Sequence, residues 1–363
     1  MCSFCRPIVN NSSSKQFKMN AESFSINNTI TPTYSLQNIT LPIFFFHQGN
    51  ETGLFFDKIL QQAKSSNGKQ NIFVLADANF HLFSDYNCID INQYRYGTVQ
   101  FDKVYKHHSS NNYFFEKACF DRWFIINAVV KDLEIEYFFH ADSDVLILEN
   151  LYQVYESFLK NKYDGTVMYL EDEHGDSVTS GHASFWSAKM IDDFCNFVCT
   201  KYQDEQAFNI LLKNTLAGKY LNNTNVSDMI LLDLFRTEAN PNALNLLSLG
   251  KNDIFFDFNL NSANNGSGHR FVMSKISKIK KITKRKGACF GKATEPSSLR
   301  FKFYTLHFQG YLIKSLIPKY VKSTGVYEAL NNYLNAEYIF LSRKLRLLKN
   351  TSRDWVFRLI GKK

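Results

Sequence analysis

Short apolar runs rich in aromatic and β-branched residues alternate with longer segments in which apolar residues recur at helical spacing. Such runs are typical of buried strands in a mostly parallel sheet, and the longer segments are typical of amphipathic helices. The predicted strands are 42–46, 71–75, 136–148 (interrupted by two acids), 165–170, 244–249, 254–260 and 301–306, with a short one within 94–108. The predicted helices are 54–64, 113–131, 150–160, 188–202, 206–216 and 226–237, and the chain after 310 is helical. The first strand, helix and strand form a βαβ unit, so the pattern predicts an α/β fold with helices flanking a mixed, mostly parallel sheet.

Length and composition fit one large α/β domain with additions, or two modest domains. The 363 residues are 45% hydrophobic and 15% aromatic, which is ample for a core, and the net charge of +8 suits anionic ligands or anionic lipid. Residues 1–35 are polar, so we expect a disordered or loosely packed leader there. We predict an α/β domain over 36–318 and a basic amphipathic helical segment over 319–363.

The cysteines and the hydropathy profile bear on localisation. Seven cysteines are scattered without a spaced framework, which indicates a reducing compartment. The sequence shows neither a signal-peptide h-region nor an apolar span long enough to cross a bilayer, so we expect a cytoplasmic protein. Residues 340–360 mix basic and apolar residues, so this segment either packs on the domain or lies peripherally on the inner face of a membrane. No base-reading motif occurs, which argues against a nucleic-acid partner.

Two acids, Asp142 and Asp144, stand at the end of an apolar run and are separated only by Ser143. The carboxyl ends of strands are where open α/β sheets bind ligands. Crowded carboxylates repel each other unless a cation lies between them, and a hard divalent ion suits oxygen ligands shared with substrate phosphates. These residues therefore predict a Mn²⁺ or Mg²⁺ site that faces a diphosphate. A solvated loop or a capping pair is the alternative.

The pattern resembles the DxD motif of glycosyltransferases with the GT-A fold, in which the acids hold Mn²⁺ or Mg²⁺ against a nucleotide-sugar diphosphate. The segment 306–314 is similar to the C-terminal HxxG…K element of several GT-A families. The resemblance implies that His307 completes the metal site, that Gly310 lets the backbone approach the diphosphate, and that Lys314 contacts phosphate. A core histidine bonded to the backbone is the alternative for His307.

The same resemblance places the nucleotide at the loop after the first strand. The donor-binding residues that it implies are His47, Gln48, Asn50, Asp77 and Ser143. Ordinary turn chemistry is the alternative for this loop, because Gly and Asn are common in turns. Arg122 matches a basic position that touches the donor in related families, although a salt bridge with Glu116 or Glu134 would explain it equally well.

The segment 180–186 resembles the part of GT-A enzymes that lines the acceptor and donor-sugar pocket. An acceptor hydroxyl needs a base if inversion is direct. The candidate bases are Asp172, Asp176, His182 and Asp228. Helix capping is the alternative for Asp228. Several GT-A families carry Gln after that acid, where this chain has Met229, so the stereochemistry is left open.

The sequence thus predicts a metal-dependent glycosyltransferase of the hexosyltransferase type. A UDP-sugar is the favoured donor, and the acceptor is a glycan, a glycolipid or a protein. Two alternatives stand beside it: a haloacid-dehalogenase-like phosphatase that uses the same DxD, and a non-catalytic carbohydrate-binding module. The phosphatases place the motif near the start of their domain with Thr or Val two positions after the second Asp, and this chain has Leu146 there.

Overall fold

A central sheet carries the acidic turn. The computed structural model describes residues 38–49, 55–171, 177–216, 225–266, 270–275, 277–285, 287–295, 300–323 and 325–360. Within them, eight strands form a sheet of order β3-β2-β1-β4-β8-β6-β7 with β9 beside β6. The strands are β1 Ile43–His47, β2 Ile72–Ala76, β3 Asn87–Asp90, β4 Tyr137–Ala141, β6 Gly165–Glu171, β7 Ser177–Ser180, β8 Ala183–Ser187 and β9 Ala243–Asn245. The strands from β3 to β4 are parallel, whereas β8 runs antiparallel to both β4 and β6.

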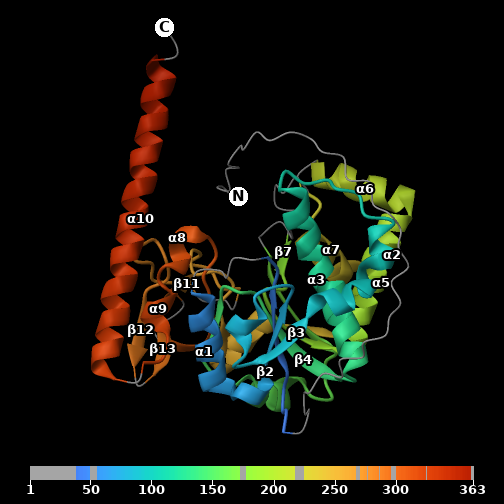
Figure 1. Ribbon diagram of the computed structural model, residues 1–363, viewed down its shortest axis with the longest axis horizontal. Coiled ribbons are helices and arrows are strands. Elements are labelled where there is room, and N and C mark those ends of the chain that lie inside the picture. Colours follow the sequence, from blue (N-terminus) through green and yellow to red (C-terminus); the bar gives the residue numbers. More distant parts are fainter. Residues whose placement is uncertain are drawn as a thin grey trace. The chain divides into compact units, whose positions relative to one another are not determined.

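Side chains of β1 are buried on both faces of this sheet, as expected for a parallel strand covered by helices. Ile43 and Phe45 share a core with Ile59 of α1 (Phe56–Asn67). Phe44 points to the opposite face, where its ring lies 5.1 Å from that of Phe138. Helices α3 (Tyr113–Asp132) and α5 (Ala188–Gln203) pack against each other on the side away from α1 (Figure 1).

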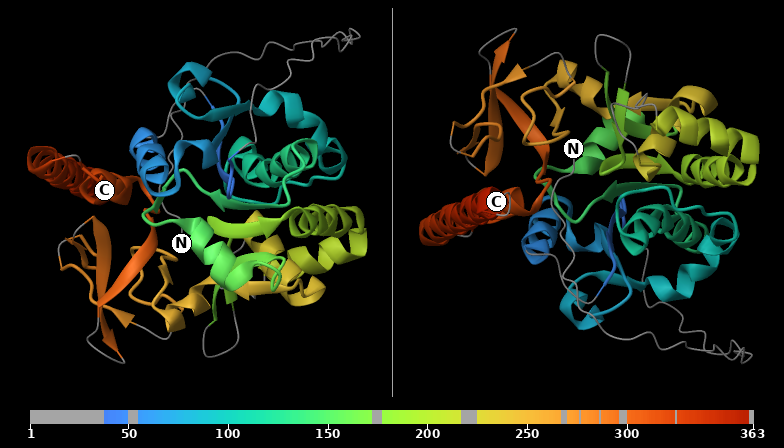
Figure 2. Two further views of the ribbon diagram at one scale, coloured as in Figure 1. Left: turned by 90° about the horizontal axis from the view of Figure 1, so that it is seen from below. Right: turned by 90° about the horizontal axis from the view of Figure 1, so that it is seen from above.

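A second sheet receives the chain directly after the acidic turn. Its described strands have the order β10-β14-β13-β11, with β12 beside β13 and β5 beside β14. They are β5 Val145–Ile147, β10 Phe255–Phe256, β11 Arg270–Phe271, β12 Ile282–Arg285, β13 Ala288–Glu295 and β14 Arg300–His307. Figure 2 shows strands β11 to β14 of this sheet, in orange, beside the C-terminal helix. The chain therefore passes from β4 of one sheet to β5 of the other through the turn 142–144.

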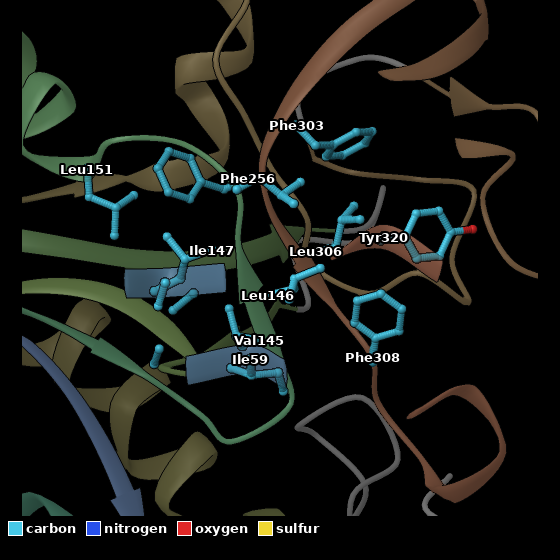
Figure 3. Packing of buried hydrophobic residues seen from close by; sticks show 14 of the residues in the cluster. Ile59, Val145, Leu146, Ile147, Leu151, Phe256, Phe303, Leu306, Phe308 and Tyr320 are labelled. Carbon is cyan, nitrogen blue, oxygen red and sulfur yellow. The ribbon is translucent and has the colours of Figure 1, made fainter. Parts of the chain in front are cut away.

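Pairing of β5 with β14 fixes the register on which the site depends. The two strands are antiparallel, and Val145 is opposite His307. Val145 and Leu146 lie in one buried cluster with Leu306 and Phe308, next to Ile59 of α1 (Figure 3). Burial of this cluster positions His307 beside the end of the acidic turn, although about 160 residues separate them in sequence.

The other described helices are mostly short. They are α2 Val99–Asp102, α4 Leu151–Val154, α6 Glu205–Leu216, α7 Asp228–Leu234, α8 Tyr311–Lys314, α9 Ile317–Tyr320 and α10 Val326–Ile360. Some of them have a side-chain N-cap. The Asn150 side chain accepts a hydrogen bond from the Gln153 amide, and the Ser227 side chain accepts one from the Ile230 amide. No helix of the described residues is both long and apolar enough to cross a bilayer.

The predicted fold class, a mixed and mostly parallel sheet flanked by helices with a C-terminal helical extension, is confirmed. The predicted strand within 94–108 is wrong, because 3-10 turns over Ile91–Thr98 and α2 occupy that stretch. Residues 246–249 are also helical rather than extended, since the Asn245 side chain accepts from the Leu247 amide and opens a 3-10 helix. The described residues belong to one compact unit, Asn38–Lys363. The predicted leader lies outside them, and the boundaries at 36 and 319 stay predictions.

Candidate functional site

The turn of Asp142, Ser143 and Asp144 lies between the two sheets and is held by its backbone at both ends. The Asp142 amide donates to the carbonyl of His182 at 2.8 Å, and the Phe308 amide donates to the carbonyl of Asp144 at 3.0 Å. The backbone bonds thus come from the start of β8 and the end of β14. The carboxylates of the two acids are left to interact with other groups.

Asp144 faces one imidazole and one ammonium. Its Oδ1 lies 3.5 Å from Nε2 of His307, and its Oδ2 lies 3.1 Å from Nζ of Lys314. Nδ1 of His307 is 2.8 Å from the carbonyl oxygen of Phe258. A carbonyl only accepts, so Nδ1 carries the proton, and in the neutral ring Nε2 presents a lone pair toward the carboxylate.

This donor set fits a hard divalent ion. A carboxylate oxygen and an imidazole nitrogen face each other across 3.5 Å, and the other imidazole nitrogen is bonded to backbone, as is usual for metal-ligating histidines. As the side chains stand, no three His, Cys, Asp or Glu groups among the described residues converge closely enough to hold a metal. The carboxylate of Asp142 is bonded to Arg122 and His140 instead.

Arg122 joins the acidic turn to the start of α7. Its Nη1 donates to Oδ1 of Asp142 at 2.5 Å, and its Nη2 donates to Oδ2 of Asp228 at 2.6 Å. Nε1 of Trp123 also donates to Oδ2 of Asp228, at 3.0 Å. The partners of Arg122 are therefore these two acids and not Glu116 or Glu134, the partners considered from sequence.

The charges of this network reinforce one another. Burial by itself raises the pKa of Asp142, but Arg122 and His140 more than offset it and hold that pKa well below its usual range. Burial acts to lower the pKa of Arg122, yet Asp142 and Asp228 bring it above its ordinary value. Asp142 is thus ionised and Arg122 protonated across the accessible pH range.

His182 lies under His307 rather than in an open pocket. The two rings stack with centroids 3.9 Å apart. Its Nε2 donates to the carbonyl of Asp257 at 3.2 Å, so its Nδ1 accepts from the hydroxyl of Ser180 at 2.8 Å. Burial, with His307 beside it, holds the pKa of His182 well below 6.5. Because both nitrogens are bonded, this geometry does not favour the predicted role of His182 as a base.

Two buried histidines, His182 and His140, predict that acid destabilises the fold. Burial lowers the pKa of His182 and of His140 below 6.5, so unfolding lets each take up a proton that the native state excludes. Their contribution to stability is complete above pH 6.5 and is lost as the pH falls, by up to about 1.4 kcal/mol per pH unit for each ring. Urea unfolding at about pH 7.5 and about pH 5.5 measures this slope. His182→Gln should make it shallower and the exposed His81→Gln should not; equal slopes in all three proteins would refute the assignment.

A buried ion pair between Lys280 and Asp257, which sequence reasoning missed, supports His182 and His307. Nζ of Lys280 lies 2.6 Å from Oδ1 of Asp257, and both side chains are 0% exposed. Oδ2 of Asp257 accepts from the backbone amide of His307 at 3.1 Å. The available signal was an acid inside the aromatic run 254–258, because such an acid is buried only with a partner.

The predicted nucleotide loop lies one strand away from the acidic turn. Phe45 of β1 is paired with Ala141 of β4, so the chain leaves β1 at His47 beside the turn 142–144. The Gly49 amide donates to Oδ1 of Asp77, which joins the loops after β1 and β2. His47 is buried against Phe56 with ring centroids 5.4 Å apart, and its Nε2 has no hydrogen-bond partner among the described residues.

The remaining predicted residues divide into three groups. Gly310 and Lys314 lie at the start and the end of α8, directly after β14. Ser143 is half-buried in the turn, and Gln48 is exposed beside β1. Asn50, Asp172 and Asp176 lie outside the described residues. The structure therefore brings Asp144 together with His307 and Lys314, and Arg122 links Asp142 to Asp228. The loop candidates after β1 lie beside the turn.

Comparison with known proteins adds distant structural likeness. No family model and no curated protein matches the chain. Mouse xyloside xylosyltransferase 1 is 10% identical over 57% of this chain and 84% of its own, with a TM-score of 0.35. The WbbM bifunctional glycosyltransferase is 8% identical over 82% of this chain and 52% of its own, with a TM-score of 0.40. A cytidylyltransferase from Leptospira borgpetersenii serovar Hardjo-bovis is 10% identical over 56% of this chain and 96% of its own, with a TM-score of 0.29. Such likeness concerns the fold, and the activity has to be argued from the site.

Proposed function

We propose that this protein transfers a sugar from a nucleotide-diphosphate donor to a hydroxyl acceptor, with Mn²⁺ or Mg²⁺ held by Asp142, Asp144 and His307. A UDP-sugar is the favoured donor, and a glycan, a glycolipid or a protein is the acceptor. The observation that carries the proposal is that Oδ1 of Asp144 and Nε2 of His307 face each other at 3.5 Å beside a strand end. A divalent cation between them would satisfy both groups.

The charges around this pair suit a departing diphosphate. When bound, the ion would stabilise the negative charge that grows on the leaving group. Lys314 supplies a fixed positive charge beside the same carboxylate, 3.1 Å from Oδ2 of Asp144. Gly310 has a φ of 93° and open space where a Cβ would lie, which supports a close approach of phosphate to its backbone. Arg122 keeps Asp142 ionised, the state that ligation requires.

The loops after β1 and β2 are the proposed binding place for base and ribose. His47 has a buried nitrogen without a partner among the described residues, and Asp77 fixes Gly49 beside it. A hollow of about 550 Å³, lined among others by Phe55, Leu82 and Tyr86, adjoins this loop. Its aromatic walls suit a planar base.

Asp228 is the base that we retain among the candidates. It is linked to the proposed metal ligand Asp142 through Arg122, whose guanidinium donates to both carboxylates. Its carboxylate is 7% exposed and is held by Arg122 and Trp123, so an acceptor hydroxyl would have to approach an oriented carboxylate. His182 is less suitable because both of its nitrogens are bonded.

Neither alternative function is favoured by the site. A dehalogenase-like phosphatase needs Asp142 as a nucleophile, but the Oδ1 atom is bonded to Arg122 and lies 3.2 Å from His140. Three parallel strands, β1 to β3, also precede the motif, which those phosphatases place near the start of the domain. A binding module without catalysis would need neither the acidic turn nor the paired Lys314.

Thermal unfolding of the purified chain with nucleotides and metals tests the proposal. UDP or GDP should raise the melting temperature only when Mn²⁺ or Mg²⁺ is present, because a ligand that binds the native state at a hundred times its Kd stabilises it by about 2.7 kcal/mol. Mass spectrometry across nucleotide sugars should then show metal-dependent donor hydrolysis. Phosphate release from sugar phosphates without any nucleotide effect would instead support the phosphatase.

A further inference from the structure

Helix α10 carries an apolar stripe that the described part of the chain leaves exposed. Each side chain of this set is at least 46% exposed, and the set consists of Tyr327, Leu330, Leu334, Tyr338, Leu341 and Leu345. At 3.6 residues per turn, their spacing places them within one arc of about 80° around the helix axis. We name these six residues the α10 stripe.

The opposite face of α10 is fixed to the domain. Ala336 and Phe340 are buried on this face, and beside the stripe Lys319 of α9 pairs with Glu337 at 2.6 Å. Nη1 of Arg343 donates to the carbonyl of Tyr311 in α8 at 3.0 Å. Figure 1 shows α10 beside α8 and α9 and continuing past them. The buried residues lie about 140° around the helix from the centre of the α10 stripe, so the stripe faces away from the domain.

Charge indicates which kind of partner covers the stripe. Residues 342–363 contain eight Lys or Arg and one Asp, so they carry +7 of the net charge of +8. A second copy in parallel would place two such segments side by side, which is repulsive. An antiparallel copy would bring only Glu328 and Glu337 against the eight cations, and Glu337 is already paired with Lys319. Anionic lipid headgroups supply the complementary charge. Tyrosine and leucine are also the side chains that settle at the boundary between headgroups and acyl chains.

We propose that α10 lies on the surface of an anionic bilayer, with the α10 stripe inserted among the lipids and the positive charge of residues 342–363 attracting it to the headgroups. The proposal goes beyond sugar transfer and does not depend on it. It places the opposite face of the helix, and with it the domain, on the water side.

Vesicle co-sedimentation of the full chain tests this directly. The protein should bind vesicles of phosphatidylcholine with phosphatidylglycerol and should not bind vesicles of phosphatidylcholine alone. Binding should weaken as salt rises, because headgroup attraction is screened. Absence of binding to the anionic vesicles, or equal binding to both kinds, would overturn the proposal.

Substitutions distinguish insertion of the α10 stripe into the bilayer from nonspecific hydrophobic binding to vesicles. Leu330→Asn with Leu334→Asn should weaken binding at least about tenfold, because two apolar side chains no longer enter the bilayer. Ile210→Asn on α6 is the matched control, since Ile210 is 53% exposed, and it should bind as the wild type does. Circular dichroism checks that the double variant keeps its helix. Equal binding of all three proteins would overturn the proposal, as would a lipid-free dimer that the double variant dissociates, since the stripe would then belong to a second copy.

Discussion

Asp144→Asn is expected to abolish the metal-dependent stabilisation by UDP and to lower transfer by at least about a hundredfold. The substitution removes the charge that faces Nε2 of His307, so a divalent ion loses both a ligand and its charge partner. The backbone carbonyl that accepts from Phe308 is untouched, and an Asn amide can donate to Nε2 of His307. Stability should therefore change by less than about 1 kcal/mol. Thermal shift assays and donor turnover, measured on the same preparation, read out the two effects.

Asp193→Asn is the control for this experiment. Asp193 is an acid of α5 that pairs with Lys189 at 2.6 Å on the surface, with 47% of its side chain exposed. It should leave the metal effect, the turnover and the melting temperature unchanged. A variant of Asp144 that kept its metal-dependent nucleotide shift would contradict the proposed ligand set, whatever its turnover.

Lys280→Met should lower the free energy of unfolding by about 3–5 kcal/mol, because it leaves Asp257 buried without a countercharge. The pair is 2.6 Å apart and 0% exposed on both sides, so water cannot solvate the remaining carboxylate. Chemical denaturation measures the loss. The effect should extend to His307, whose amide donates to the other oxygen of Asp257.

Two further variants show whether the loss comes from the uncompensated charge. Lys302→Met breaks a pair with Glu149 that is 2.7 Å long but 37% and 22% exposed, and it should lower stability by less than about 1 kcal/mol. Adding Asp257→Asn to Lys280→Met removes the buried charge and keeps an acceptor for the His307 amide, so it should recover much of the loss. A Lys280→Met protein as stable as the Lys302→Met protein would contradict this account.

The sequence predicted the elements whose pattern is local. The helix at 113–131 and the strand before Asp142 were predicted because each carries its own periodicity, and α3 and β4 are found there. The helix predicted from 150 likewise begins there, with Asn150 as the N-cap of α4. The strand at 254–260 was overextended, since β10 covers only Phe255 and Phe256. The pattern of this segment is typical of a strand, but the segment contains Asp257, which forms a buried ion pair with Lys280.

Partners distant in sequence could not be predicted. Nothing near Arg122 in sequence indicates that it bridges Asp142 and Asp228, because that contact depends on how α3, β4 and the start of α7 pack. The pairing of Lys280 with Asp257 depends likewise on the second sheet. The proximity of His307 to Asp144 was expected from a family resemblance, whereas its physical cause, the pairing of β14 with β5, is visible only in the structure. The roles of these residues stay predictions.

Pulsed electron paramagnetic resonance of Mn²⁺ added to the protein with UDP tests the central claim most directly. The ion should show nitrogen modulation from one imidazole, and His307→Gln should remove that modulation while Asp142 and Asp144 still hold the ion more weakly. If the wild-type spectrum lacks imidazole nitrogen, or keeps it in the His307→Gln protein, the ion is not held by His307 together with the acidic turn.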